Sequence, residues 1–151
     1  MSQVKAVLPM LMVPKYMNTE VAYKLSNYEF QCKCTEPDCT WSVIHHELIS
    51  GWNALRKQHG KPLRVNSGFR CQKHNSKPEI KGVPTSRHSS GMAIDIFIGD
   101  LNPVDKALII KRAKEIFYFV KVYPVFIHCQ VEPDTEMHLG TGHFEEPPKK
   151  T

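Results

Sequence analysis

The chain has 151 residues, a net charge of +5 and a pI near 9.0, with 41% hydrophobic and 23% charged residues. This composition is ordinary for a globular protein, and the length suits one domain with its own core. No run approaches the roughly 18 apolar residues of a membrane span. The positive charge favours a polyanionic partner, although a basic surface without such a role is the simpler interpretation.

The N-terminal segment does not have the form of a secretory signal. The apolar stretch Ala6–Val13 follows Lys5 but is short and is broken by Pro9. It continues into Pro14 rather than into a cleavage site of small residues. We therefore expect it to belong to the mature fold, and the protein to be made in the cytoplasm without a signal peptide. Residues 1–25 carry no strong hydrophobic period.

The sequence contains five cysteines, Cys32, Cys34, Cys39, Cys71 and Cys129. The first three lie close together along the chain. An odd count without a signal peptide argues against a disulfide framework. Cys32, Cys34 and Cys39 could form part of a structural zinc site, with Cys71 or a histidine as the fourth ligand. Their spacing is not that of paired C-x-x-C motifs, so reduced, buried cysteines are the simpler interpretation.

Two short signals predict helix starts in the first half of the chain. Ser26 and Glu29 have the spacing of a capping box, which predicts a helical turn around residues 27–30. Thr40 or Ser42 can cap a longer helix that ends at Gly60. Its predicted apolar stripe consists of Ile44, Leu48, Trp52 and Leu55. His45 and His46 at its start are interpreted as polar surface residues.

A second long helix is predicted in the C-terminal half. Asn102 is the expected N-cap, Pro103 the first helical residue, and Asp105 an acid in the first turn. The pattern extends this helix to about Lys121. Its predicted buried face is made of Val104, Leu108, Ala113, Ile116, Phe117 and Val120.

Three strands are predicted, over Leu63–Asn66, residues 92–98 and Phe126–Val131. Residues 67–75 and 76–87 are expected to be loops because they are rich in Ser, Gly, Asn, Lys and Pro. In the second strand the side chains of Ala93, Asp95 and Phe97 share one face, and three isoleucines share the other. In the third strand Phe126, His128 and Gln130 share a face.

The stretch Ser86–Phe97 reads S-R-H-S-S-G-M-A-I-D-I-F and places a charged residue within a predicted strand. Asp95 lies among β-forming residues, where its burial costs several kcal/mol unless a partner compensates it. A divalent cation shared with His88 is one suitable partner. Gly91 between them suits a sharp chain reversal. If the strand carrying His128 lies beside that of Asp95, the three residues form a catalytic zinc site that water completes.

These residues also carry a family resemblance. The pattern S-x-H-x-x-G-x-A-x-D of residues 86–95 resembles the signature of zinc D-Ala-D-Ala carboxypeptidases and related peptidoglycan peptidases. The block S-G-F-R-C-x-x-H-N of residues 67–75 is similar to the block that precedes the signature in that family, and Y-P-x-F-I-H of residues 123–128 resembles its third-ligand strand. The likeness spans about residues 27–131.

The resemblance implies a fold and a set of site residues within a single domain. The implied fold class is α+β, with a small antiparallel sheet that carries the zinc site and packs against two main helices, as in hedgehog-like zinc peptidases. The implied zinc ligands are His88, Asp95 and His128, with water at the open position. Arg70 matches the arginine that holds a substrate carboxylate, and Ser86 matches a serine that hydrogen-bonds near the site.

The sequence departs from the family pattern at the general base. Val125 occupies a position where several branches of the family have an acid, and Gln130 replaces the aspartate of an H-x-D pattern. Glutamine cannot take a proton in that role. The predicted catalytic residues are therefore Glu132 and His138, with Glu136 and His143 as further candidates.

The leading hypothesis is a zinc peptidase that cleaves peptidoglycan stem peptides, as a carboxypeptidase or cross-link endopeptidase. It would suit a monomeric, phage-type lysin that reaches the cell wall after lysis or is carried on a virion. The alternative is a non-catalytic, zinc-stabilised module that binds the wall or serves as a virion component. A nucleic-acid partner is not expected, since no basic stripe with interleaved aromatic residues occurs.

Overall fold

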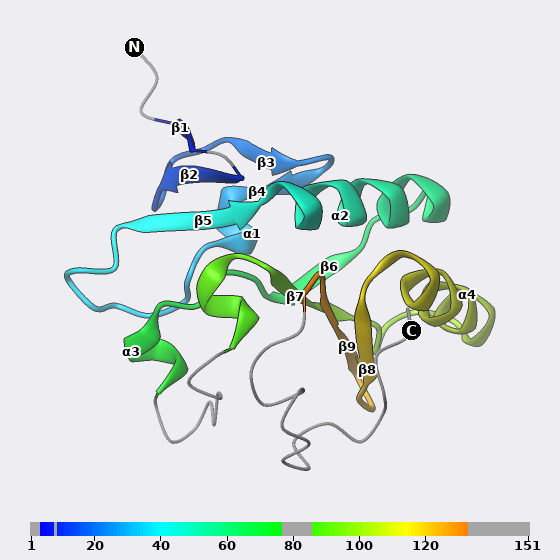
Figure 1. The fold of residues 1–151 in the computed structure, drawn as a ribbon. Coiled ribbons are helices and arrows are strands. Elements are labelled where there is room, and N and C mark those ends of the chain that lie inside the picture. Colours follow the sequence, from blue (N-terminus) through cyan, green and yellow to red (C-terminus); the bar gives the residue numbers. More distant parts are fainter. Residues whose placement is uncertain (1–3, 8, 77–85, 133–151) are drawn as a thin grey trace.

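A computed structural model of the chain describes residues 4–7, 9–76 and 86–132 (Figure 1). The predicted roles of Glu136, His138 and His143, and the frayed tail expected at 145–151, fall outside these residues. The described part has mixed α+β structure with small antiparallel sheets, which confirms the predicted fold class.

The central sheet has four antiparallel strands in the order β6-β7-β9-β8. Its strands are β6 (Arg64–Ser67), β7 (Ala93–Phe97), β8 (Phe119–Val122) and β9 (Phe126–Gln130). The predictions of β6, β7 and β9 are confirmed to within one residue at each end, and β8 is an additional strand. Ile94 and Ile96 on β7 are fully buried in the core, while Asp95 faces the other side.

The N-terminal residues form strands that the sequence did not predict. A three-stranded antiparallel sheet contains β1 (Lys5–Val7), β2 (Met10–Pro14) and β5 (Trp41–His45), and a small hairpin contains β3 (Glu20–Ala22) and β4 (Leu25–Ser26). Val13 is fully buried, so this segment does belong to the fold.

The first long helix, α2 (His46–His59), starts later than predicted because residues 41–45 form β5. Neither Thr40 nor Ser42 caps it; the N-cap is His45, whose Nδ1 accepts a hydrogen bond from the Glu47 backbone at 3.2 Å. His45 is buried, so its interpretation as a surface residue was wrong. The predicted end at Gly60 is confirmed by its left-handed φ of 71°.

The apolar stripe predicted for this helix is buried as expected. Leu48, Trp52 and Leu55 have no exposed surface, and Ile44 is buried from the neighbouring strand β5. The indole Nε1 of Trp52 donates to the Tyr23 carbonyl at 2.7 Å. This contact attaches the β3–β4 hairpin to α2.

The second long helix, α4 (Pro103–Ile116), begins as predicted but ends earlier. Asn102 accepts the backbone N–H of Asp105 at 2.8 Å. The predicted extension to Lys121 was wrong, because Val120 pairs with Cys129 in the sheet. Val104 and Leu108 were also wrongly placed in the core: they are 68% and 37% exposed.

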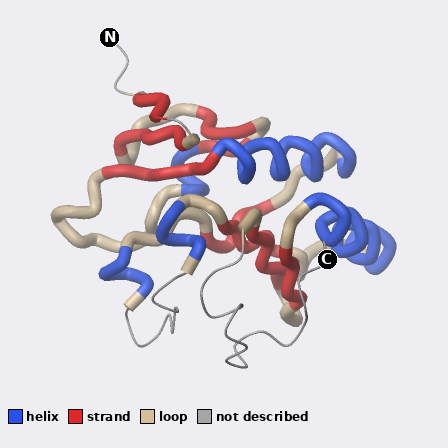
Figure 2. The backbone as a smooth tube through the Cα atoms, in the orientation of Figure 1, coloured by secondary structure: helices blue, strands red, loops and turns tan. Residues whose placement is uncertain are grey.

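Figure 2 shows the two long helices next to each other, with the strands of the central sheet to one side of them. The face of α4 that is buried contains Ile109, Ala113 and the following Phe117. The ring of Phe117 lies directly against Gly51 of α2, where a Cβ atom would come within 2.6 Å of it.

Three short helical turns complete the described structure: α1 (Asn27–Phe30), α3 (Gln72–Asn75) and the 3-10 turn η1 (Arg87–Ser90). The predicted capping box of α1 is confirmed, with Ser26 and Glu29 bonded reciprocally. The turn α3 lies within the loop predicted at residues 67–75, and η1 begins at the last residue of the loop predicted at 76–87. No helix in the described part of the chain is long and apolar enough to cross a membrane.

Candidate metal centre

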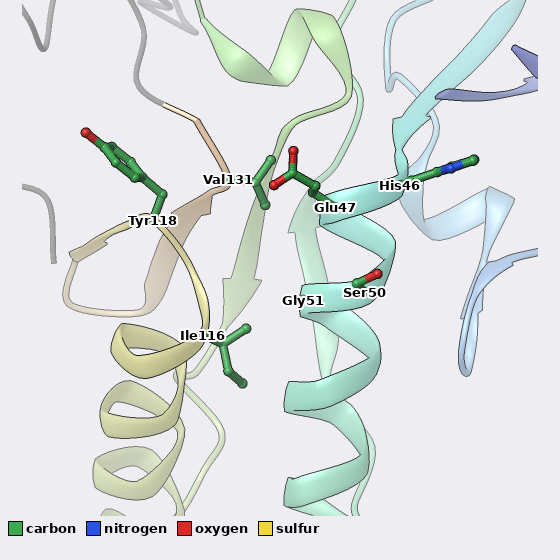
Figure 3. Close-up of a pocket in the computed structure, with 7 residues that line it drawn as sticks. All are labelled: His46, Glu47, Ser50, Gly51, Ile116, Tyr118 and Val131. Carbon is green, nitrogen blue, oxygen red and sulfur yellow. The ribbon is translucent and has the colours of Figure 1, made fainter. Parts of the chain in front are cut away.

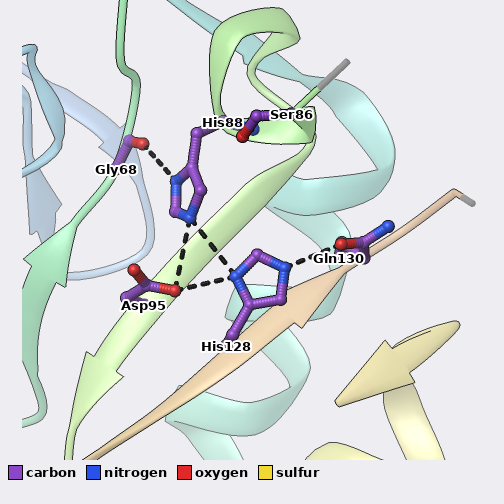
Figure 4. A network of polar contacts seen from close by, with 6 residues as sticks. All are labelled: Gly68, Ser86, His88, Asp95, His128 and Gln130. Carbon is purple, nitrogen blue, oxygen red and sulfur yellow. Dashed lines mark hydrogen bonds and ion pairs between the residues drawn. The ribbon is translucent and has the colours of Figure 1, made fainter. Parts of the chain in front are cut away.

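Asp95 and His128 are brought together by strand pairing. They are directly opposite each other in the antiparallel pair β7–β9, so their side chains lie on the same face. The Nδ1 atom of His128 lies 2.9 Å from Oδ1 of Asp95 (Figure 4). The predicted adjacency of the two strands is therefore confirmed.

His88 reaches the same point from η1, the turn that precedes β7. Its Nε2 atom lies 3.3 Å from Asp95 Oδ1 and 3.3 Å from His128 Nδ1. The three ligand atoms all lie within 4.8 Å of one another, which is the grouping needed to share one cation.

Gly91 makes the turn between His88 and β7 possible. Its φ is 73°, in the left-handed region that glycine adopts without penalty. A Cβ atom at this position would collide with the Val43 carbonyl on β5. The Gly91 carbonyl also accepts the backbone N–H of His45 at 2.9 Å, which attaches η1 to the N-terminal sheet.

Each histidine has a second contact that determines which ring nitrogen faces the centre. The Nδ1–H of His88 donates to the Gly68 carbonyl at 2.8 Å, so its Nε2 lone pair points toward Asp95. His128 donates through Nε2–H to Oε1 of Gln130 at 2.7 Å, which leaves Nδ1 as the free lone pair. Such outer contacts orient metal-binding imidazoles.

The amide orientation of Gln130 follows from its other partner. Its Nε2 donates to the Glu132 carbonyl at 2.6 Å, and a carbonyl can only accept. The amide oxygen must therefore face His128. Sequence reasoning treated Gln130 as a lost base and missed this role, although its place on the same strand face as His128 was the available signal.

The electrostatics of the centre depend on burial and on the close contacts between the three side chains. Burial raises the pKa of the Asp95 carboxyl, but His88 and His128 outweigh it and bring that pKa well below its usual range. Burial lowers the pKa of His88. For His128 burial also acts downward, but the hydrogen bond and charge of Asp95 raise its pKa overall.

Arg70 lies beside the centre in the segment that follows β6. Its backbone N–H donates to the His88 carbonyl at 3.2 Å. Burial lowers the pKa of its guanidinium, and the charge of Asp95 opposes this shift. The Nε atom is buried and has no hydrogen-bond partner among the described residues. A planar cation with an unused donor is suited to binding a carboxylate.

Ser86 is the N-cap of η1. Its Oγ accepts the backbone N–H of His88 at 3.2 Å, and the side chain is nearly buried. This contact positions the turn that carries His88. Binding of substrate by Ser86 stays a prediction.

Glu132 belongs to a second group of ionisable side chains. Its carboxylate lies within 4.8 Å of ligand atoms of His45 and Glu47, in a cluster distinct from the one formed by the three ligands above. The neighbouring Val131 and Glu47 line an open hollow of about 540 Å³ between α2, the end of α4 and β9 (Figure 3).

Comparison with known proteins gives the family. The family model described as Peptidase M15 matches residues 22–130, which is well over half of the chain. The chain belongs to the peptidase M15 family. No curated protein sequence matches it.

Membership of family M15 gives the chain the general character of a zinc-dependent metallopeptidase. It confirms the resemblance drawn from the motifs of residues 67–75, 86–95 and 123–128. The donor set of two imidazoles and one carboxylate fits zinc, which binds nitrogen and oxygen ligands with three protein side chains in its catalytic sites.

Proposed function

We propose that this M15 peptidase hydrolyses peptide bonds in peptidoglycan stem peptides, with one zinc ion held by His88, Asp95 and His128. The observation that carries the proposal is the convergence of His88 Nε2, Asp95 Oδ1 and His128 Nδ1, with the other nitrogen of each imidazole already occupied. Bound zinc supplies a water of lowered pKa and polarises the scissile carbonyl.

Arg70 is the proposed anchor for the substrate. The Nε atom of its guanidinium is buried and has no hydrogen-bond partner in the described structure, and the charge of Asp95 acts on the guanidinium. A peptide that ends in a carboxylate would satisfy this donor through a charge-assisted hydrogen bond. This favours a carboxypeptidase over an endopeptidase that cleaves inside a cross-link.

Glu132 and His138 stay our candidates for proton transfer. Val125, where an acid occurs in several branches of the family, is 48% exposed and apolar, and Gln130 is occupied as the acceptor for His128. Glu132 lies two residues beyond Gln130, the last residue of β9. A Glu132→Gln variant that binds zinc but is slower by two or more orders of magnitude would identify the base.

The main experiment combines substrate cleavage with metal analysis. Purified peptidoglycan, and separately a peptide ending in D-Ala-D-Ala, are incubated with the protein with and without a chelator, and products are identified by mass spectrometry. We expect chelator-sensitive release of the terminal residue and no release by His88→Ala. A protein that holds a zinc ion that His88→Ala loses, but that cleaves neither substrate, would contradict the proposal.

That contradicting result would favour a second function, a zinc-stabilised module that binds wall peptides without cleaving them. The observation behind this alternative is that Glu132 groups with His45 and Glu47, while an amide occupies position 130. Sedimentation with insoluble peptidoglycan tests it directly. Arg70→Met should then weaken retention on the wall.

If the enzyme hypothesis holds, we expect the protein to act as a phage-type lysin.

A further inference from the structure

A second group of side chains that could bind a metal is distinct from the group formed by His88, Asp95 and His128. Cys32, Cys34 and Cys39 come from the segment between α1 and β5, and Cys71 is the N-cap of α3. All four are free thiols, and their sulfur atoms lie within 4.8 Å of one another. Cys71 Sγ is 3.7 Å from Cys32 Sγ and 3.5 Å from Cys34 Sγ.

We propose that these four cysteines bind a structural zinc ion. Tetrahedral zinc–thiolate sites have Zn–S bonds of about 2.3 Å, which places neighbouring sulfurs about 3.8 Å apart. The two measured separations are close to that value and far beyond a covalent S–S bond of about 2.0 Å. Four thiolates close the coordination shell, so the ion would have a structural role.

The surroundings of the sulfurs suit thiolates. The backbone N–H of Cys71 points at Cys32 Sγ at 3.4 Å, and that of His74 points at Cys71 Sγ at 3.4 Å. Lys15 places its ammonium 3.6 Å from Cys39 Sγ and donates to the Cys34 carbonyl at 3.0 Å. A divalent ion with four thiolates carries a net charge of −2, which these donors and the lysine partly offset.

His74 is the competing ligand. Its Nδ1 lies 3.2 Å from Cys32 Sγ, which is a hydrogen-bond distance to sulfur. We assign it to the outer shell because the four thiols already form a complete set within one ligand sphere. Substituting Cys39 and His74 one at a time shows which of the two residues is a ligand of the ion.

The proposed ion would connect segments that lie far apart in the sequence. Cys71 directly follows Arg70, and the Phe69 backbone N–H already donates to the Phe30 carbonyl at 2.7 Å. Fixing Cys71 to the loop of Cys32 and Cys34 therefore holds the segment that carries Arg70 and the Gly68 carbonyl. Any effect on catalysis rests on the proposed function, but binding of the ion does not.

The test counts zinc per chain after gel filtration, without reference to activity. Wild-type protein should contain two equivalents, His88→Ala one, and Cys34→Ser one. Cys129→Ala is the matched control: its thiol is buried in the core outside the cluster, and two equivalents should remain. His74→Ala should also retain two. Loss of an ion in His74→Ala but not in Cys39→Ser would overturn the four-thiolate assignment.

A second measurement is independent of whether the cysteine variants fold. Addition of a mercurial thiol reagent to folded wild-type protein should release one equivalent of zinc, detected with a chromogenic chelator, and His88→Ala should release the same amount. Cobalt substitution should add intense thiolate-to-metal absorption in His88→Ala. The proposal is overturned if His88→Ala holds no metal, or if mass analysis finds a disulfide within the cluster. A failure of peptidase activity would leave both readouts unchanged.

Discussion

Asp95 and His128 are opposite each other in the β7–β9 pair, with Oδ1 and Nδ1 only 2.9 Å apart. Two of the three proposed ligands are therefore positioned by the backbone hydrogen bonds of the central sheet. The third, His88, depends on a four-residue turn held by Ser86 and Gly91. A site built on strands is more rigid than one built on loops, so the turn is the part most sensitive to substitution.

Gln130 should tune the proposed metal site through His128. Gln130→Met keeps the length of the side chain but removes the acceptor for His128 Nε2–H. We expect zinc affinity at this site to fall by about 10- to 100-fold, the usual loss for outer contacts of this kind. Competition with a chelator of known affinity measures it. An unchanged affinity would show that Gln130 only fills space.

Arg70 should discriminate between substrates by their C-terminus. In Arg70→Met a peptide with a free carboxylate should lose about 10- to 100-fold in kcat/KM, because a charged hydrogen bond contributes about 1.5–3 kcal/mol. The corresponding peptide amide has no carboxylate for Arg70 to bind, so its kcat/KM should change little. Parallel kinetics on both peptides give the answer, and equal losses on both would argue against a carboxylate contact.

Gly91 and Gly60 form a matched pair for the turn. Both have a left-handed φ, 73° and 71°, but an added Cβ meets the Val43 carbonyl only at Gly91 and nothing within 4 Å at Gly60. Gly60→Ala should lower the free energy of unfolding by about 1–2 kcal/mol. Gly91→Ala should cost more than about 3 kcal/mol and weaken zinc binding. Urea titrations compare them; equal losses would mean that β5 moves away freely.

Asp105 should make a pH-dependent contribution to stability. Lys61 donates to its carboxylate at 2.9 Å, and this contact lowers the pKa of Asp105 in the folded state. Because the folded pKa is the lower one, the stabilisation is present above the unfolded value of about 3.9 and is lost as pH falls through the folded value.

The corresponding experiment compares wild type with Asp105→Asn. The free energy of unfolding of the wild type should be slightly larger than that of Asp105→Asn at neutral pH. This difference should shrink below about pH 4 and should fall with added salt. Urea titrations at several pH values measure this difference directly. A difference that stays constant across this range would exclude the ion pair as its source.

The candidate metal site could be predicted from the sequence because two of its candidate ligands differ in polarity from their sequence neighbours. Asp95 is a charge among β-formers, and His128 lies in an apolar strand. The partner of His88 could not be predicted, because the Gly68 acceptor is a backbone carbonyl whose position depends on the pairing of β6 with β7. The choice of Cys71 as the fourth thiol likewise needed the fold, since 39 residues separate it from Cys32.

Errors in the fold occurred where helical and strand patterns overlap. Residues 117–121 suit the end of a helix, but Val120 is drawn into the sheet by pairing with Cys129, which outweighs local preference. In the same way Ile44 fits the apolar stripe of α2 yet belongs to β5, where it is opposite Leu11. The short N-terminal strands carry too few residues to show a period.

The strand β5 lies within the region matched by the M15 family, but its partner β2 precedes that region. Strand β2 (residues 10–14) therefore pairs with the backbone donors and acceptors along one edge of β5, and the other neighbour of β5 is the η1 turn. A protein shortened to the family boundary at residue 22 would present that row of groups to solvent as an open edge. Such edges recruit other chains, so a shortened protein should self-associate even with its zinc ligands intact.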